Sequence, residues 1–169
     1  INTLINRFDT YIMKKEWSKV SFSSWMSNLD RGFLTDGDGF STNWFGHPIH
    51  GSLFYNAART HNMNFWQAAP YVAGGSLMWE FLGETEPASS IDLYTTTFGG
   101  IYLGEVIYRL TDFAWNYPRN KKDPLFGKIA GSLLNPVAGI NRFVFDRNIP
   151  FTSKSLTPVT VDIFIGTNH

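Results

Sequence analysis

The residues best suited to chemistry lie between positions 43 and 109, where imidazoles and carboxylates stand among aromatic and small residues. His47 and His50 are three residues apart, and Glu80 and Glu105 are isolated acids in apolar surroundings. Burying a polar group alone costs several kcal/mol, so such groups are paired in the fold or serve a function. An imidazole held near a carboxylate in a partly dry cleft could perform general acid–base catalysis.

For a catalytic site we predict His47 as the general base or metal ligand and Glu80 as a second acid–base group. Glu105 would then be the carboxylate that orients the imidazole, with Glu84 and Asp92 in reserve. The chemistry that suits this set is hydrolysis of a lipid or cell-envelope substrate. The sequence has no nucleophile elbow, phosphate loop or His-Glu-x-x-His motif to support it.

A structural explanation competes with the catalytic one and is favoured. His-x-x-His alone is a weak metal signal, and a helix-capping or hydrogen-bonded pair is the commoner arrangement. Glu105 and Arg109 have the i,i+4 spacing and order that favour an ion pair, whereas Glu80 and Glu84 repel each other at that spacing. Both glutamates are expected to be exposed, unless one is protonated or paired with a cation. On this view the polar residues form one buried network that fixes helix register, composed of His47, Arg59, Glu80, Glu105 and Arg109.

Composition excludes several functions. Cysteine is absent, so disulfides, thiolate zinc sites and cysteine nucleophiles are excluded. The formal net charge is zero, which argues against a broad electrostatic contact with nucleic acid. The acidic, glycine-rich segment 35–39 resembles a calcium loop only in part, because no glutamate closes it, and a plain turn is favoured. We predict no metal and no cofactor.

The apolar periodicity predicts helices, and their ends carry recognisable signals. Two short amphipathic helices are expected in residues 1–33. His47 in extended conformation and Pro48 at the first helical position predict a helix start, and Asn62 suits its exit. Ser89 or Ser90 is the expected cap of the helix whose first turn holds Asp92. Further helices are predicted over 48–61, 65–83, 91–115 and 125–134, with one or two turns over 137–146.

Two helices contain expected irregularities. Pro70 predicts a kink or a late start in the helix over 65–83. Residues 95–99 interrupt the helix over 91–115. Gly100 and Gly104, spaced four apart, predict close approach of another helix.

Strict alternation of apolar and polar residues after Pro158 predicts a half-buried strand. A lone strand needs partners, so a sheet or barrel is expected to follow it in a longer parent protein. The predicted fold is mainly α, a bundle of short helices with glycine and alanine seams and a terminal β-strand. We divide the chain into a helical domain, 1–150, and a linker with the start of a β region, 151–169.

Aromatic residues make up 17% of the chain, which suits either a dense core or anchoring at a membrane interface. The longest uncharged run, 63–79, is shorter than the roughly 20 apolar residues that cross a bilayer. No transmembrane helix is predicted. The chain starts at Ile1, which is typical of a piece of a longer protein.

The motif Phe40-Ser-Thr-Asn-Trp-Phe-Gly-His-Pro-Ile-His-Gly51 resembles the opening signature of domain-of-unknown-function family 3943. The resemblance extends over 17–147 through Tyr55-Asn-Ala-Ala-Arg59, Gly75-Ser-Leu-Met-Trp-Glu80, Glu86-Pro87 with Asp92, Gly99-Gly100 with Gly104-Glu105, and Asn135-Pro136 with Asn141-Arg142. It implies an exported, outer-membrane-associated protein of Gram-negative bacteria, with a helical block before a β-barrel. His50 departs from the expected pattern around His-Pro, which argues against a shared metal site.

Three functions follow. The first is a non-catalytic helical packing module on a β-barrel or a membrane surface, at the periplasmic side of the outer membrane or within it. The second is the membrane-associated hydrolase described above. The third is binding of lipid or another small apolar ligand, for which the predicted binding residues are Trp79, Tyr55, Arg59 and Arg109. An apolar pocket lined by Phe54, Trp66, Tyr71, Trp79 and Tyr102 would be its sign.

Overall fold

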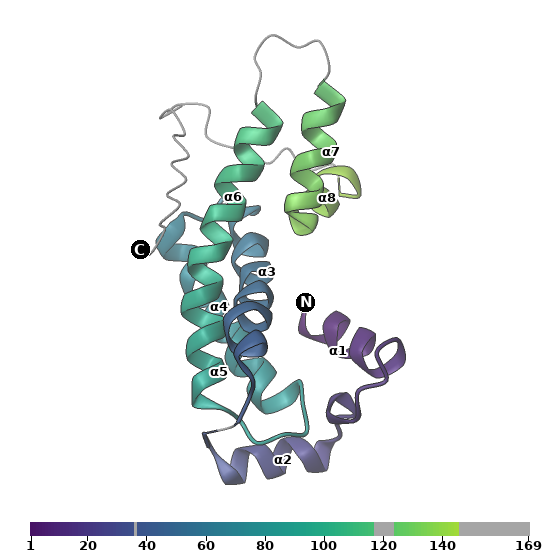
Figure 1. The fold of residues 1–169 in the computed structure, drawn as a ribbon, viewed down its shortest axis with the longest axis vertical. Helices are drawn as coiled ribbons and strands as arrows, with labels where there is room; N and C mark the ends of the chain where they lie inside the picture. Colours follow the sequence, from purple (N-terminus) through teal and green to yellow (C-terminus); the bar gives the residue numbers. More distant parts are fainter. Residues whose placement is uncertain (36, 117–123, 146–169) are drawn as a thin grey trace, which may run out of the picture.

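The computed structural model describes residues 1–35, 37–116 and 124–145, and within them the chain is mainly helical (Figure 1). The elements in chain order are α1 (Asn2–Tyr11), η1 (Glu16–Ser18), α2 (Phe22–Arg31), η2 (Thr42–Gly46), α3 (His47–Arg59), α4 (Phe65–Leu82), α5 (Ser90–Tyr94), η3 (Thr95–Gly99), α6 (Gly100–Asn116), α7 (Pro124–Leu134) and α8 (Pro136–Phe143). The described part confirms the mainly helical class. The predicted strand after Pro158 lies outside the described residues.

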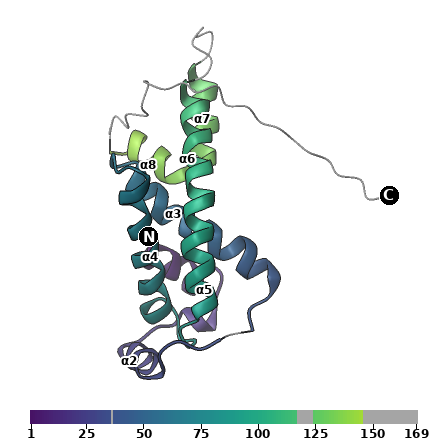
Figure 2. The same cartoon turned by 90° about the vertical axis from the view of Figure 1, so that its left-hand side faces the viewer.

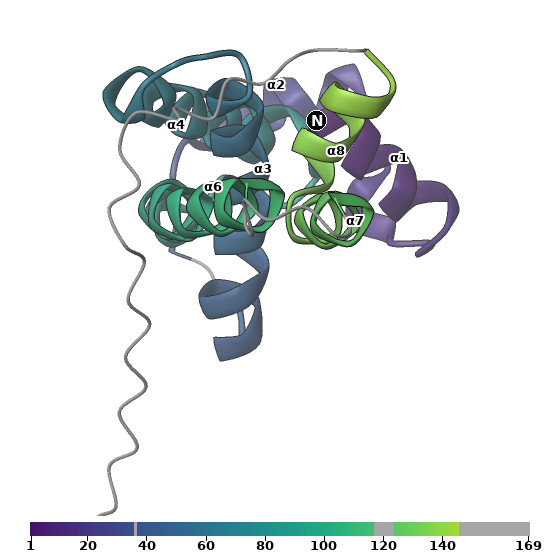
Figure 3. The same ribbon diagram turned by 90° about the horizontal axis from the view of Figure 1, so that it is seen from above.

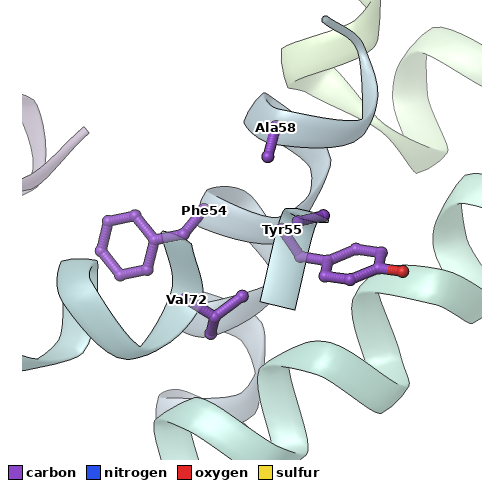
Figure 4. Close-up of a cluster of buried hydrophobic side chains, with 5 residues drawn as sticks. Phe54, Tyr55, Ala58 and Val72 are labelled. Atoms are coloured by element: carbon purple, nitrogen blue, oxygen red, sulfur yellow. The ribbon is translucent and has the colours of Figure 1, made fainter. Parts of the chain in front are cut away.

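Helix α3 is the centre of the bundle and lies between α4 and α6, as the view along the bundle shows (Figure 3). Its buried stripe includes Phe54, Tyr55 and Ala58, which pack with Ala68 and Val72 of α4. Figure 4 shows Phe54 and Tyr55 pointing to opposite sides of α3, with the Tyr55 ring directed toward α6. One helix therefore supplies both halves of the core.

The contact between α3 and α6 depends on glycines, as the spacing of Gly100 and Gly104 predicted. A Cβ at Gly100 would lie 2.5 Å from the Cα of Gly51, and one at Gly104 would lie 2.7 Å from Tyr55 Cβ. The two backbones therefore approach more closely than any side chain would allow. In Figure 2, α6 runs as a long rod along the length of the molecule.

Helix α3 begins at His47, which confirms the predicted start at His47–Pro48, but the extended conformation predicted for His47 is wrong. His47 is helical, with φ −64° and ψ −45°, and α3 continues directly from the π-helical turn η2. The His47 N–H bonds to the carbonyl of Thr42, five residues back. The prediction rested on the steric restriction that proline places on the residue before it, which disfavours the helical conformation without forbidding it. The exit at Asn62 is confirmed by its positive φ of 66°.

The other irregularities are resolved in different ways. Helix α4 begins at Phe65, where the Asn64 side chain and Gln67 form a capping box, so the late start at Pro70 is wrong. The expected interruption over 95–99 is confirmed as the π-helical segment η3, which joins α5 to α6 without a break. Of the two candidate caps, Ser89 is the one that caps α5, and its side chain accepts a hydrogen bond from the Asp92 N–H.

The N-terminal helices are attached to the end of α4 by buried asparagines. The Asn6 amide donates to the carbonyls of Ser18 and Gly83, each at 2.8 Å. Asn28 on α2 donates to the Glu84 carbonyl at 3.0 Å. These bonds place two amphipathic helices around the C-terminal end of α4. Across the described residues, every helix is too short or too polar to span a bilayer.

Candidate functional site

Three elements far apart in the sequence bring their polar side chains together at the first residue of α3. His47 Nε2 lies 3.1 Å from Asp92 Oδ1 and 3.6 Å from Asp38 Oδ2. The Asp92 side chain is 5% exposed and that of His47 12%, whereas Asp38 is 44% exposed. We call these residues, with Glu80 and Glu84 of the neighbouring helix end, the acidic cluster. It is deep on one side and open to solvent at Asp38.

Glu80 is fully buried, and it contacts the N-terminal end of α5, the helix that carries Asp92. Its Oε2 accepts a hydrogen bond from the Ser89 N–H at 2.8 Å. Ser89 in turn caps α5 by accepting from the Asp92 N–H at 3.2 Å. Ser89 also forms an isolated parallel β-bridge with Leu34, which attaches the loop after α2 to the start of α5. Glu80 is thus a positioning residue for Asp92.

The electrostatics of the acidic cluster favour the protonated forms of His47 and Glu84. Burial opposes the charged form of His47, but the carboxylates of Asp92, Glu80 and Asp38 outweigh it and raise the pKa of His47. Burial raises the pKa of Glu84 to about 9, and the charges of Glu80, Asp92, Asp38 and Glu86 add to the effect. Glu84 is therefore protonated at neutral pH. Of the explanations for Glu80 and Glu84, joint exposure is wrong and protonation of one of them is supported.

His50 does not share a site with His47. Its ring packs against Phe54, with 4.9 Å between centroids, and edge-on against Trp79 at 4.6 Å. Burial lowers the pKa of His50 to about 4, and the positive charge of His47 adds to the decrease. His50 is therefore a neutral core residue, and the predicted hydrogen-bonded pair of histidines is not what the structure shows.

A second polar group lies further along α3, and we call it the arginine cluster. Glu105 accepts a hydrogen bond from Tyr55 Oη at 2.7 Å through Oε2, which also lies 3.2 Å from Arg59 Nε. Its Oε1 accepts from Arg109 Nε at 2.8 Å, which is the predicted i,i+4 pair. The Arg59 guanidinium also donates to the Met63 carbonyl and stacks on the Tyr108 ring, 4.0 Å from its centroid. Burial and the bond to Glu105 raise the pKa of Tyr55.

The structure divides the predicted site residues between these two clusters. His47, Glu80, Glu84 and Asp92 belong to the acidic cluster, whereas Glu105, Tyr55, Arg59 and Arg109 belong to the arginine cluster. Tyr55 and Arg59 follow His47 by two to three helical turns, which is about 12–18 Å along the axis. Glu105 is therefore too far away to orient His47, and Asp92, one of the reserve residues, holds that place. The single network predicted for all five polar residues is wrong for the same reason.

Several residues that meet α3 could not be identified from the sequence. The segment that contains Asp38 predicts a plain turn, and no local feature indicates that Asp38 meets His47. Two buried asparagines of the C-terminal part also reach α3: Asn135 donates to Asn56 and Asn141 to Thr60, each at 2.7 Å. The only sequence signal for these pairs was that Asn56, Asn135 and Asn141 occurred within family-like motifs.

An apolar cavity of about 890 Å³ opens between the start of α1 and the side of α3 and α4. Of the aromatic residues predicted to line a pocket, Phe54 and Tyr71 do so. Trp79 instead packs in the core against Trp17 and His50, and Trp66 and Tyr102 are exposed elsewhere. Most of the cavity lining is aliphatic or small.

Comparison with known proteins gives one match. A sequence model with the description "Domain of unknown function (DUF3943)" matches residues 32–137, which contain both clusters. No curated protein and no solved structure matches the chain significantly.

Proposed function

Because the chain belongs to this family of unknown function, we propose its role from its own surface: it is a non-catalytic helical packing module of an outer-membrane-associated protein. The observation that carries the proposal is the amount of aromatic side chain left exposed by a well-packed bundle. Monomeric soluble proteins rarely expose large contiguous apolar patches, and such patches mark contact with proteins or membranes.

The clearest patch follows the rod formed by α5, η3 and α6. Its members recur every four residues, and all are more than half exposed: Tyr94, Phe98, Tyr102 and Val106. Tyr94 and Phe98 stack with an interplanar angle of 10°. A second group lies on and beside η2, which contacts η3, and comprises Phe40, Trp44, Phe45 and Ile49. We call these eight residues the aromatic surface.

Aromatic rings suit the boundary between hydrocarbon and headgroups, because they combine an apolar body with a polarisable face or a polar tip. The net charge of zero means that attachment would depend on apolar contact and not on attraction to anionic lipid. The aromatic surface therefore rests on the periplasmic side of the outer membrane or on a β-barrel within it, and the helices lie on the surface without crossing it.

The experiment is co-sedimentation with vesicles of phosphatidylcholine and phosphatidylethanolamine, followed by tryptophan fluorescence. We expect the chain to sediment with the vesicles and its emission to shift to the blue. Replacing Phe98 and Tyr102 together by serine should weaken partitioning roughly tenfold or more, from the apolar area lost. Trp66→Ser is the matched control, since it removes an exposed ring outside the aromatic surface. A chain that stays in solution, or an equal loss in the control, contradicts the membrane form of the proposal.

The cavity beside α3 and α4 supports a second candidate, binding of a small apolar ligand. Its volume falls within the range of ligand pockets, and its lining includes Phe54, Met63, Tyr71 and Met78. Gly74 also lines it, and a Cβ there would meet no atom within 4 Å. Gly74→Leu would therefore place an apolar side chain at the cavity wall, with room for its Cβ atom.

A fluorescent fatty acid such as cis-parinaric acid is a suitable probe. We expect one molecule to bind per chain, and Gly74→Leu to weaken binding at least tenfold. Gly39→Leu is the control, because it adds the same side chain at another glycine with open space around it. Absence of binding to the lipid-free protein, or equal binding by both variants, removes this candidate.

A further inference from the structure

The side chains that meet at the first residue of α3 have the types and the spacing of metal ligands. One oxygen of Asp38, one nitrogen of His47 and one oxygen of Asp92 all lie within 4.8 Å of one another. Ligand atoms about 2.1 Å from one cation, at tetrahedral or octahedral angles, lie about 3.0–3.4 Å apart. The separations of His47 Nε2 from the two carboxylates, 3.1 and 3.6 Å, agree with such an arrangement.

A second feature points the same way and concerns His47 itself. Its Nε2 is buried from solvent and faces two carboxylates at once, 3.1 Å from Asp92 Oδ1 and 3.6 Å from Asp38 Oδ2. A ring nitrogen that converges with two carboxylate oxygens on one region of space is placed to share a cation with them.

The ligands are also supported as metal ligands usually are. Asp92 is held in the first turn of α5 by the Ser89 cap, and Ser89 is held by the buried Glu80. Such outer contacts orient ligating groups and are a large part of metal affinity. Asp38, by contrast, is in an exposed loop, so an ion could reach the site from solvent and the loop could close on it.

We propose that Asp38, His47 and Asp92 bind one divalent transition-metal ion of the zinc class and thereby fasten the loop before η2 to the helical layer. An imidazole among the ligands favours zinc or a neighbouring metal over calcium, which prefers oxygen ligands only. Three protein ligands leave at least one position for water. Phe40 and Trp44 of the aromatic surface follow this loop directly, so the ion would fix where that surface begins.

The test is calorimetric titration of the chelator-treated chain with zinc chloride, with circular dichroism to confirm folding. We expect one ion per chain. Asp38→Asn should weaken binding at least tenfold while the exposed loop leaves the fold intact, and Asp30→Asn, an exposed control on α2, should change affinity less than twofold. His47→Gln should abolish stoichiometric binding, and Co²⁺ added to the unmodified chain should give a visible absorption band that this variant lacks.

Three results would overturn the proposal. One is the absence of stoichiometric zinc binding, and another is equal affinity in Asp38→Asn, which would show that Asp38 is not a ligand. The third is a calcium affinity above that for zinc and unchanged in His47→Gln, since the imidazole would then not be a ligand. The proposal does not depend on vesicle binding, because metal affinity and membrane partitioning are separate measurements and either can fail alone.

Discussion

The two polar clusters on α3 stabilise buried charge in opposite ways. In the arginine cluster one carboxylate, Glu105, accepts a hydrogen bond from a tyrosine hydroxyl and pairs with two arginines, so its negative charge is neutralised by neighbouring positive charges. In the acidic cluster one imidazole, His47, faces several carboxylates, and the raised pKa of Glu84 shows that acid outweighs base there. The first arrangement needs nothing from outside the protein, and the second gains from a bound proton or cation.

The difference separates two roles that look alike in the sequence. A carboxylate neutralised by arginines fixes the distance between two helices and leaves no site for a ligand. Carboxylates that converge on one imidazole can also take up a cation. We therefore assign helix packing to the arginine cluster and ligand binding to the acidic one, and substitutions in each should behave differently.

The largest effect should come from Glu105→Gln. The side chain of Glu105 is 13% exposed, and the variant leaves the Arg59 guanidinium facing a neutral amide in a largely buried position. Breaking one partner of such a pair costs about 2–4 kcal/mol, because the remaining charge stays buried without compensation. Urea unfolding at pH 7 measures the loss. The control is Glu86→Gln, which makes the same change at an exposed carboxylate and should alter the free energy of unfolding by less than about 0.5 kcal/mol. A similar value for Glu105→Gln would contradict the matched-charge description.

The next effect is a pH dependence that belongs to Glu84. Its pKa is about 9 in the folded chain and 4.5 ordinarily, so between these values the folded state holds a proton that the unfolded state has released. Stability therefore falls as pH rises through this window, by up to about 1.4 kcal/mol per pH unit from this group. Burial of Glu84 is the largest cause of this shift, and the negative charges of Glu80, Asp92, Asp38 and Glu86 add to it.

Urea unfolding of the chelator-treated chain from pH 5 to pH 9 tests this dependence. Glu84→Gln should remove the part of the slope that Glu84 contributes, and the variant should be more stable than the original chain at pH 8 by about 1 kcal/mol or more. Its matched control is Glu16→Gln, which removes an exposed carboxylate paired with Lys19. An unchanged slope in Glu84→Gln would mean that the acidic cluster does not hold the extra proton.

Glu80→Gln should have a smaller effect, although Glu80 is more deeply buried than Glu105. The amide oxygen can still accept from the Ser89 N–H, so the cap of α5 stays in place. We expect a change in the free energy of unfolding below about 1 kcal/mol. The pKa of Glu84 should fall at the same time, which reduces the slope of stability against pH. Destabilisation as large as that of Glu105→Gln would remove the distinction between the clusters.

Local features of the fold could be predicted from the sequence because local signals determine them. The capping Ser89, the interruption over 95–99, the Glu105–Arg109 pair and the glycine seam at Gly100 and Gly104 all depend on residues within a few positions of one another. The conformation at His47 was missed because the π turn before it alters the usual consequence of a following proline.

The composition of the candidate site could be predicted only in part. His47 and Glu80 are predicted as polar residues in apolar surroundings and Asp92 as a reserve carboxylate, but their roles depend on which helices meet. Asp38 is 9 residues before His47 and Asp92 is 45 residues after it, and no periodicity relates them. Equally, Glu105 was grouped with His47 because both are isolated, whereas helix length along α3 separates them.

The smallest effect should come from Arg109→Gln, which tests whether matched charge or burial makes the arginine cluster stable. Arg109 is 71% exposed, and its removal leaves Glu105 with Tyr55 and Arg59. An exposed i,i+4 ion pair contributes about 0.3–0.5 kcal/mol, and salt screens it. Urea unfolding in low and in 1 M salt should show a loss of that size in low salt and almost none in high salt. If Arg109→Gln cost as much as Glu105→Gln at both salt concentrations, the exposed arginine would be essential, and the buried pair of Glu105 with Arg59 could not explain the packing of α3 on α6.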